Sequence, residues 1–449
     1  MNVSRQIAEH VVGTRSESIP GEVIEAAKRL ILDTLGVAWA GSSAPGIPET
    51  RELVANEGGT AESVVWAYGD RLPASAAAFL NSSLAAALDY DSVHQAGQVH
   101  ADIIALPAAL AMAQRQHVSG PEFIAALALG TDLICRLGMS AHRNSGWFFT
   151  SIHGVLGAAA VSARLLRLDA DATANALGIA LSHVGGTQQA LVEKSLTKRL
   201  QAGFAARAGV FSALLAAGGI TGPKEALEGK FGFYAMYENG SPERLLDGLG
   251  SRYEILNTTT KKYPSCTCNH TLIDGVIQIV SEFELTKDDV TSVEVFISPF
   301  MNQLVGAPFD PAGNPQVTAQ FSAQYSVASA ILRRRLGIAE IQDAAVLEPA
   351  IAGIAKRVKV TVDESNTEKF APTTIILHSK AHGAIRRRME HVPGTPQSPM
   401  SEAEHQNKFL ECTSSGSRPL SRAKSMLIAR RVKAIENVAD MALFFDDVI

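Results

Sequence analysis

The sequence predicts a mainly helical protein with a smaller α+β part, and three observations support this fold class. Ala-, Gly- and Leu-rich stretches with apolar residues at helical spacing follow one another from residue 20 to about residue 250. β-branched residues form strand-like runs only later, between 290 and 378. The tail, 399–449, then returns to helical periodicity. We therefore expect a large helical domain made of 1–258 and 397–449, and a smaller α+β lid domain at 259–396.

The helical elements are justified in chain order. In 20–41 a proline near the start and Gly41 at the end fit helix boundaries around a helical apolar period. Similar periods predict helices over 74–88, 106–114, 121–137, 155–166, 170–182, 199–217 and 223–228. The residue pattern changes after Cys268 and one further predicted helix, 271–283, because β-branched residues then begin to alternate with polar ones. Strands are predicted at 290–297, 358–362 and 373–378, with helices at 318–336 and 338–346 between them.

Composition narrows the class of protein. The 449-residue chain is long enough for about two or three domains, and its formal net charge of -5 lacks the basic excess of a nucleic-acid-binding surface. Four cysteines are too few for a disulfide framework, so a cytoplasmic location is expected. The longest uncharged stretches, 144–163 and 172–192, are too polar for membrane spans and predict buried helices.

Two clusters of ionisable residues interrupt the helical sequence. Asp89 and Asp91 are followed by His94 and His100, and they would share one pocket only if the backbone leaves the helix. A solvated helix cap or a metal site are the alternatives, although no HExxH pattern supports a metal. In the second cluster, Lys194, Lys198 and Arg199 stand at a helix start. Cations there oppose the helix dipole, which indicates an anionic partner unless the run is simply solvated.

A third cluster, TTTKKYPSCTCNH, contains a proline and therefore predicts a loop. Its Lys, Tyr and His side chains are all competent in proton transfer. Cys266 and Cys268 are one residue apart, which fits neither a structural zinc site nor a redox CxxC pair. The chain also lacks the GxGxxG, GxxxxGK[ST] and GxSxG patterns. After these exclusions, the remaining class of reaction is proton transfer that needs no cofactor and no metal.

Several long stretches resemble the MmgE/PrpD family, which contains 2-methylcitrate dehydratases, cis-aconitate decarboxylases and iminodisuccinate epimerases. The resemblance rests on ILDTLGVAWAG, LDYD, KRLQAGFAARAGVFSALLAAGGITGP, KKYPSCTCNH and AQFSAQYSVASAI, in that order. It implies a large helical domain, a smaller α+β lid and a homodimer.

The resemblance also implies site residues. Asp89 matches the first Asp of the family's DFDDT stretch and His100 its downstream His, while Lys198 matches the Lys of GxxxKRxxxG. Lys261 opens the KxYPxC segment and His270 closes it. Catalytic roles are predicted for these residues. Neighbouring side chains are predicted to bind substrate: Asp91, His94, Arg199, Lys262, Tyr263 and Cys266.

Three positions depart from the family pattern. Val93 replaces a Thr, Phe148-Phe149-Thr150 replaces HPT, and Ala202 replaces a His. Each change removes a possible hydrogen bond worth roughly 0.5 to 1.5 kcal/mol, which indicates a drier and less highly charged substrate than a tricarboxylate. His153 either replaces the missing His or is an ordinary core residue.

Together these features predict a cofactor-independent lyase, a dehydratase that removes a proton α to a carboxylate of a hydroxy di- or tricarboxylic acid. Decarboxylation or epimerisation of a related acid is one alternative, because both reactions need much the same groups. A binding protein that keeps the fold without catalysis is the other. The expected partners are a carboxylic acid substrate and a second copy of the chain, without nucleic acid or membrane.

Overall fold

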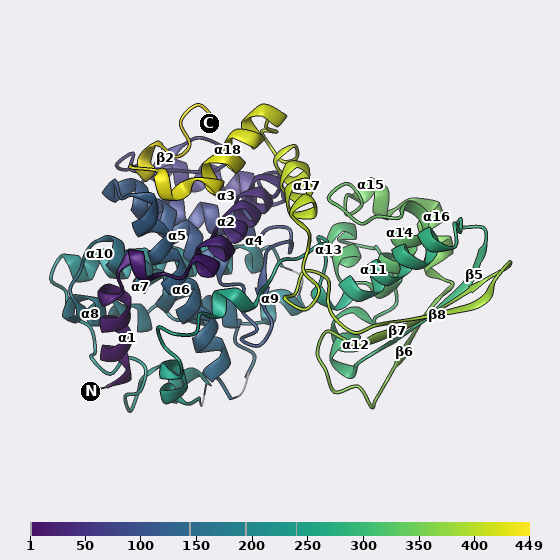
Figure 1. The fold of residues 1–449 in the computed structure, drawn as a ribbon, viewed down its shortest axis with the longest axis horizontal. Helices are drawn as coiled ribbons and strands as arrows, with labels where there is room; N and C mark the ends of the chain where they lie inside the picture. The colour runs from purple at the N-terminus through teal and green to yellow at the C-terminus, as the bar shows by residue number, and fades with distance from the viewer. Residues whose placement is uncertain (1, 143–144, 194, 239) are drawn as a thin grey trace. The chain divides into compact units, whose positions relative to one another are not determined.

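The computed structural model describes residues 2–142, 145–193, 195–238 and 240–449 (Figure 1). Lys194 of the second cluster lies outside the described residues. The chain divides into two compact units, Met1–Thr260 with Ala403–Ile449, and Lys261–Glu402. The first unit is built from helices and the second combines helices with a four-stranded sheet. The predicted fold class, a large helical domain plus a smaller α+β domain, is confirmed.

In the helical domain, α10 (Thr197–Ala217) packs against α4 (Ala74–Ala86) and α7 (Phe149–Leu165). Glycines allow this close approach, since a Cβ atom on Gly203 would lie 2.6 Å from the Phe79 carbonyl oxygen and one on Gly209 would lie 2.7 Å from the Val155 carbonyl oxygen. The remaining core helices are α2 (Gly21–Gly41), α5 (Asp102–Gln116), α6 (Gly120–Ser140) and α8 (Ala170–Leu181).

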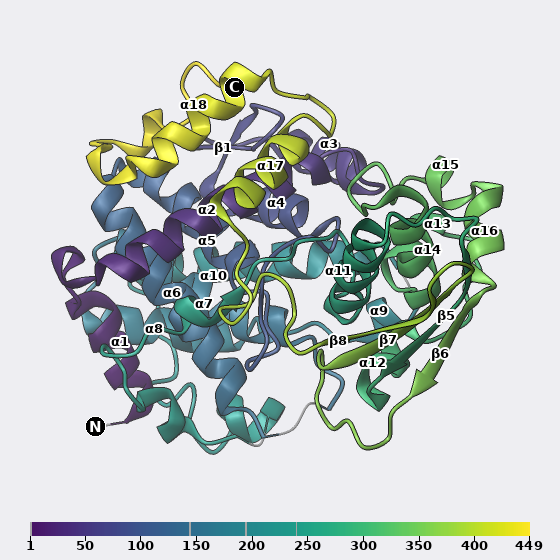
Figure 2. The ribbon, with the colours of Figure 1, turned by 45° about the vertical axis from the view of Figure 1, so that its right-hand side comes forward.

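The C-terminal segment forms α17 (Glu402–Thr413) and α18 (Arg422–Lys433), which confirms the predicted helical tail. Figures 1 and 2 show these yellow helices beside α2, although the two segments are far apart in sequence. The Trp39 Nε1–H of α2 donates to the Arg418 carbonyl at 2.9 Å. Gly36 leaves room for Phe409, whose Cδ2 would lie 3.1 Å from an added Cβ. The tail therefore belongs to the core of the helical domain.

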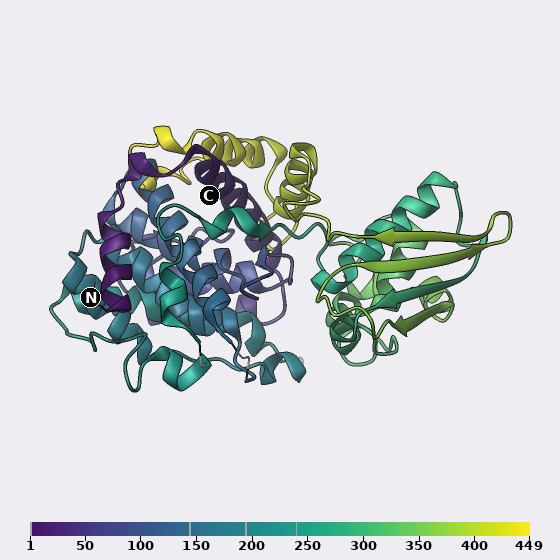
Figure 3. The same ribbon diagram turned by 60° about the horizontal axis from the view of Figure 1, so that its bottom comes forward.

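The α+β domain has one sheet with the strand order β6-β5-β7-β8. Its strands are β5 (Val290–Ile297), β6 (Val358–Val362), β7 (Thr373–Ser379) and β8 (Gly383–Met389). β5 pairs with β6 in parallel and with β7 antiparallel, and β7–β8 is an antiparallel hairpin. The sheet packs against α11 (Thr267–Glu282) and α14 (Ala323–Arg333), which the ribbon shows beside it (Figure 3).

Some predicted elements are wrong. Residues 223–228 form turns rather than a helix, and 338–346 is helical only in α15 (Asp343–Val346). The predicted helix 318–336 is interrupted between α13 (Pro315–Gln320) and α14, because the Ser322 hydroxyl accepts from the Tyr325 amide at 3.2 Å and starts a new helix. The sequence also missed β8, α1 (Val3–Gly13) and α3 (Ile47–Glu57).

The short elements complete the description. They are α9 (Gln189–Val192), α12 (Pro299–Val305), α16 (Pro349–Ala355), β1 (Ser63–Val64), β2 (Arg71–Leu72), β3 (Val93–His94) and β4 (Thr258–Thr259). Of these, β3 and β4 pair antiparallel and border the first ionisable cluster.

Within the described residues, α6 and α10 are long and apolar enough to span a membrane by length and composition alone. The domain buries 94% of the apolar window of α6 and 56% of that of α10. A buried core helix passes the same test, so this is weak evidence for a membrane span.

Candidate active site

The first cluster lies in a turn that follows α4. The helix ends at Ala86, and Asp89 adopts a left-handed backbone conformation with φ of 52°. Asp tolerates this conformation better than most residues do. Asp89 and Asp91 are 9% and 1% exposed, so the solvated helix cap is excluded. The turn is the non-helical geometry that two carboxylates so close in sequence would need to share one pocket.

Asp91 and His100 form a carboxylate–imidazole pair. The Asp91 Oδ2 atom lies 2.7 Å from His100 Nδ1, which also lies 2.8 Å from the Ser92 carbonyl oxygen. Both neighbours are acceptors, so the Nδ1 atom carries a proton. In neutral His100 the lone pair is then on Nε2, as in imidazole bases whose tautomer an acidic partner fixes. The His100 backbone N–H donates to the Thr150 hydroxyl at 3.0 Å.

Lys198 pairs with the other carboxylate of this turn. Its Nζ atom lies 2.8 Å from Asp89 Oδ1, and both side chains are mostly buried. Asp89 is thus the anionic partner that the placement of a lysine at the start of α10 predicts. Arg199 is also buried and donates to the Pro45 carbonyl at 2.7 Å. Burial lowers the pKa of Arg199. Neither cation belongs to a solvated charge run.

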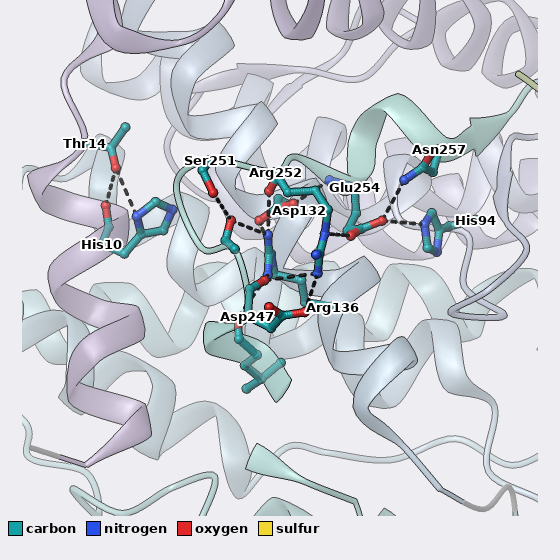
Figure 4. Close-up of polar contacts among 12 residues, drawn as sticks. His10, Thr14, His94, Asp132, Arg136, Asp247, Ser251, Arg252, Glu254 and Asn257 are labelled. Carbon is teal, nitrogen blue, oxygen red and sulfur yellow. Dashed lines mark hydrogen bonds and ion pairs between the residues drawn. The ribbon is translucent and has the colours of Figure 1, made fainter. Parts of the chain in front are cut away.

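His94 lies in a buried polar network inside the helical domain, shown in Figure 4. Its Nδ1 atom accepts from the Gly97 N–H at 3.0 Å, and its Nε2 atom lies 3.5 Å from Glu254 Oε2. The hydrogen bond with His94 is the main reason that the pKa of Glu254 is lowered to about 2. Arg252 also pairs with Glu254, at 2.9 Å. Both His94 nitrogens therefore have protein partners, and the predicted substrate contact of His94 stays a prediction.

The same network fixes the loop that precedes β4. Asp132 accepts from the Glu254 N–H at 2.6 Å and from Arg136 Nε at 2.6 Å. Arg136 also donates to the carbonyl oxygens of Leu245 and Asp247 (Figure 4). Buried charges of this kind need such partners, and here they join α6 to the loop that leads into β4.

A third buried carboxylate, Asp102, lies beside the turn and was not among the predicted site residues. Asp102 accepts from the Ser92 hydroxyl at 2.5 Å and from Thr131 at 3.3 Å. Burial raises the pKa of Asp102 to about 6. An Asp that follows two His within one short stretch was the only available signal, because Thr131 comes from the distant helix α6.

The three departures from the family pattern are all at buried or partly buried positions. Val93 pairs with Thr259 across the β3–β4 ladder, and Ala202 is fully buried within α10. Phe149 is buried with its ring 4.9 Å from that of His153. His153 is itself fully buried beside Phe233, and burial lowers its pKa to about 3. His153 therefore lies in the core, as the second of its two interpretations predicted.

The third cluster belongs to the α+β domain. Lys261 is 2% exposed, and Cys266 caps the start of α11, where its N–H donates to the Gln320 carbonyl at 2.9 Å. Contact with Cys266 and burial raise the pKa of the Cys268 thiol, while the positive charge of Lys261 opposes that rise.

Lys262, Tyr263 and His270 lie around one turn of α11. Lys262 Nζ and the Tyr263 hydroxyl both donate to Asp274 Oδ1, at 2.8 Å and 2.7 Å. The rings of Tyr263 and His270 meet edge to face at 5.4 Å. The buried His270 Nε2 lies 3.3 Å from the Ser265 carbonyl oxygen, so this nitrogen carries the proton. Lys262 and Tyr263 thus hold α11, and substrate contact by this set stays a prediction.

Metal binding has no support from geometry. Among the described residues, no group of three or more His, Cys, Asp or Glu side chains is arranged to hold a metal ion. The predicted site residues therefore form two sets, one in each domain: the helical domain holds the two carboxylates with His94, His100, Lys198 and Arg199, and the α+β domain holds Lys261, Lys262, Tyr263, Cys266 and His270.

Comparisons with known proteins match most of both parts of the chain that carry these two sets. Residues 5–245 match the MmgE/PrpD N-terminal domain, and residues 263–432 match the MmgE/PrpD C-terminal domain. A cis-aconitate decarboxylase-like protein of Aspergillus oryzae is 32% identical over 279 residues, which is 58% of each chain. The chain thus spans little more than half the length of that relative.

Longer matches extend over nearly the whole chain. The cis-aconitate decarboxylase of Aspergillus terreus is 27% identical over 82% of this chain and 79% of its own. The cis-aconitate decarboxylase of Homo sapiens is 26% identical over 98% of this chain and 93% of its own. The chain belongs to the MmgE/PrpD family and is an enzyme of the lyase type.

Proposed function

We propose that the chain is a cofactor-independent lyase that acts on a di- or tricarboxylic acid by proton transfer at the carbon next to a carboxylate. The Asp91–His100 pair carries this proposal, because the Ser92 carbonyl oxygen holds the Nδ1 proton, the Asp91 carboxylate lies 2.7 Å from the same nitrogen, and His100 can then carry a proton at its Nε2 atom. Lys198, in the same domain as this pair, supplies positive charge for a substrate carboxylate and for the enolate-like charge of the reaction.

Dehydration of a hydroxy acid is the reaction that the tautomer of His100 favours. Neutral His100 takes the proton from the carbon α to the carboxylate, the electron pair forms the new double bond, and the hydroxyl leaves as water when the protonated His100 gives that proton to it. The first step needs a base, and Nε2 of His100 is one in the neutral form.

Decarboxylation of an acid like cis-aconitate is the second candidate, and the names of the curated relatives favour it. In this reaction the bond to one carboxylate breaks, CO₂ leaves, and the electron pair left on carbon takes a proton from protonated His100. The buried apolar residues Val93, Phe149 and Ala202 favour an acid with fewer charges than cis-aconitate, which is itself a tricarboxylate.

The test is an NMR assay of metal-stripped protein with citrate, methylcitrate, cis-aconitate and iminodisuccinate-type acids in deuterated water. Loss of water identifies a dehydratase, loss of CO₂ a decarboxylase, and deuterium entry alone an epimerase. We expect D91N, which keeps the shape of the side chain, to lower kcat at least roughly 100-fold while the protein stays folded. Full activity of D91N, or activity that returns only with added metal, would refute the proposal.

We also propose that the chain is cytoplasmic and pairs with a second copy of itself. All four cysteines are buried free thiols, which supports a reducing compartment. The exposed face of α10 carries Phe204 and Phe211, seven residues apart and therefore on one side of the helix, and Leu196 lies exposed just before it. Large apolar side chains gathered on one face support a protein–protein contact.

A further inference from the structure

A buried ion pair links the C-terminal helix to the turn that carries Asp89 and Asp91. Lys408 of α17 lies with its Nζ atom 2.6 Å from Asp33 Oδ1 of α2, and these side chains are 4% and 2% exposed. Removing two charges from water is costly, and replacing a buried pair by apolar residues is often neutral or stabilising. Stability alone therefore does not account for a lysine and an aspartate at these positions.

The second partner of Lys408, Tyr90, lies in the candidate site. Its Nζ atom donates to the carbonyl oxygen of Tyr90 at 3.0 Å and lies 4.0 Å from the centre of the Tyr90 ring. Tyr90 is the residue between Asp89, which pairs with Lys198, and Asp91, which pairs with His100. One ammonium group thus holds both the backbone and the ring of the residue that separates the two carboxylates.

The geometry of the turn explains why the contacts of Lys408 with Tyr90 matter. A peptide group is planar, so fixing the carbonyl oxygen of Tyr90 fixes the plane that leads into Asp91. The backbone of Asp89 is left-handed, a conformation that few non-glycine residues adopt without support from their surroundings. On the far side of Asp91, the Ser92 hydroxyl is held by Asp102 at 2.5 Å. The turn is therefore clamped by buried charged groups before and after Asp91.

We propose that Lys408, held by Asp33, is a positioning residue that sets the orientation of the Asp89–Asp91 turn toward Lys198 and His100. This inference rests on the proposed function, in which the Asp91–His100 pair transfers the proton. It adds two residues far from the site in sequence, one of them in the C-terminal tail, to the groups that determine the rate. A small misplacement of a catalytic group can lower a rate by about 100-fold.

The experiment separates positioning from stability with paired variants. K408M leaves Asp33 buried without its lysine, and we expect its Tm to fall. D33L/K408M removes both charges, and we expect its Tm to recover while kcat stays about 100-fold below the wild type and KM changes only a few-fold. Recovery of both Tm and kcat in the double variant would mean that the pair is only structural and would overturn the proposal.

The helix that carries Asp33, α2, also offers a matched control. Lys28 of α2 pairs with Glu436 of the C-terminal segment at 2.6 Å and with Glu25 at 2.9 Å. K28M/E436Q removes this second link between α2 and the tail, and we expect wild-type kcat. An equal loss of kcat in K28M/E436Q would attribute the effect to docking of the tail and count against Lys408. If D33L/K408M does not unfold cooperatively, D33N/K408Q replaces it under the same criteria, because its amides can hydrogen-bond to each other.

Hydrogen exchange tests the proposal independently of turnover. We expect peptides that cover residues 88–95 to exchange faster in D33L/K408M than in the wild type or in K28M/E436Q. Unchanged exchange would refute positioning by Lys408. If the wild type turns over none of the acids, the proposed function fails, and the exchange measurement alone then decides whether Lys408 holds the turn.

Discussion

At the scale of single residues, the ion pair of Lys198 with Asp89 separates a role in the site from a role in stability. Both side chains are mostly buried, so K198M leaves a partly desolvated carboxylate behind, which costs about 1 to 3 kcal/mol of folding free energy. In the reaction, a fixed cation also stabilises developing negative charge. We expect K198M to lower kcat/KM roughly 100-fold in protein that still folds, with a loss of about 1 to 3 kcal/mol in chemical denaturation.

The control for this substitution is on the same helix. Arg207 of α10 pairs with Glu57 at 3.2 Å on the exposed side of the domain. R207M removes a cation and an ion pair from α10 without touching the turn at Asp89, so kcat/KM should stay at the wild-type value. Equal losses in K198M and R207M would show that charge removal from α10, rather than the position of Lys198, lowers the activity.

His153 predicts how stability depends on pH. Burial lowers its pKa to about 3, whereas an exposed histidine in the unfolded chain titrates near 6.5. Above pH 6.5 both states are neutral at this site. As the pH falls from 6.5 toward 3, the unfolded chain binds a proton that the folded protein does not, so the free energy of unfolding decreases by about 1.4 kcal/mol per pH unit.

Replacing this imidazole by an apolar side chain should remove that loss. The difference in the free energy of unfolding, H153L minus wild type, should grow by about 1.4 kcal/mol per unit between pH 6 and pH 4 and stay constant above pH 7. Urea unfolding at four pH values measures it. Other buried histidines, such as His10 with a pKa lowered to about 4, are present in both proteins and cancel. A pH-independent difference would contradict the assignment of His153 as a buried neutral residue.

At the scale of elements, the contact of α10 with α7 depends on Gly209. An added Cβ atom would lie 2.4 Å from Ala158 Cβ and 2.7 Å from the Val155 carbonyl oxygen, so backbone would have to move. We expect G209A to lower the free energy of unfolding by about 1 to 3 kcal/mol. Gly218 ends the same helix at φ of -79°, and an added Cβ would make only ordinary contacts, 3.4 Å from the Leu215 carbonyl oxygen and 3.6 Å from that of Leu214, so G218A should be neutral or slightly stabilising. A thermal melt of both variants decides this, and equal Tm values would refute the packing argument.

Periodicity predicted the long helices of the chain well because each buries one face against the core. The expected helices 20–41 and 199–217 correspond to α2 (Gly21–Gly41) and α10 (Thr197–Ala217). Errors occurred where tertiary contacts override local pattern. β8 (Gly383–Met389) is rich in arginine, because alternate side chains of this edge strand are exposed, and its pairing with β7 cannot be read from its own composition.

At the scale of the whole molecule, the sequence predicted which residues gather in each domain but not how they pair. Asp89 and Lys198 are 109 residues apart, and no periodicity links them. Asp33, Glu254 and Lys408 were missed for the same reason, since a buried charge shows its importance only through the partners that the fold brings to it. The expected domain limits, 259 and 396, can be compared with the observed unit Lys261–Glu402.

The proposed homodimer is the prediction that concerns the assembled protein. Phe204 and Phe211 are 51% and 47% exposed on one side of α10. Phe204 also stacks on Phe79 at 5.3 Å, so this face is already ordered in the single chain. Covering two such rings removes apolar surface from water without cost in backbone order. We expect light scattering to give twice the chain mass of 47.6 kDa for the wild type and the monomer mass for F204E/F211E.

An exposed apolar residue outside α10 provides a control for the α10 contact. Leu443 is 58% exposed in the C-terminal segment, and L443E should leave the dimer intact because the proposal places the contact on α10. Lys198 lies in the first turn of the same helix, so the monomeric variant also shows whether α10 needs its partner copy to keep the pair with Asp89. A monomeric wild type, or a dimer that survives F204E/F211E but not L443E, would exclude the α10 face as the contact and leave its exposed phenylalanines without this explanation.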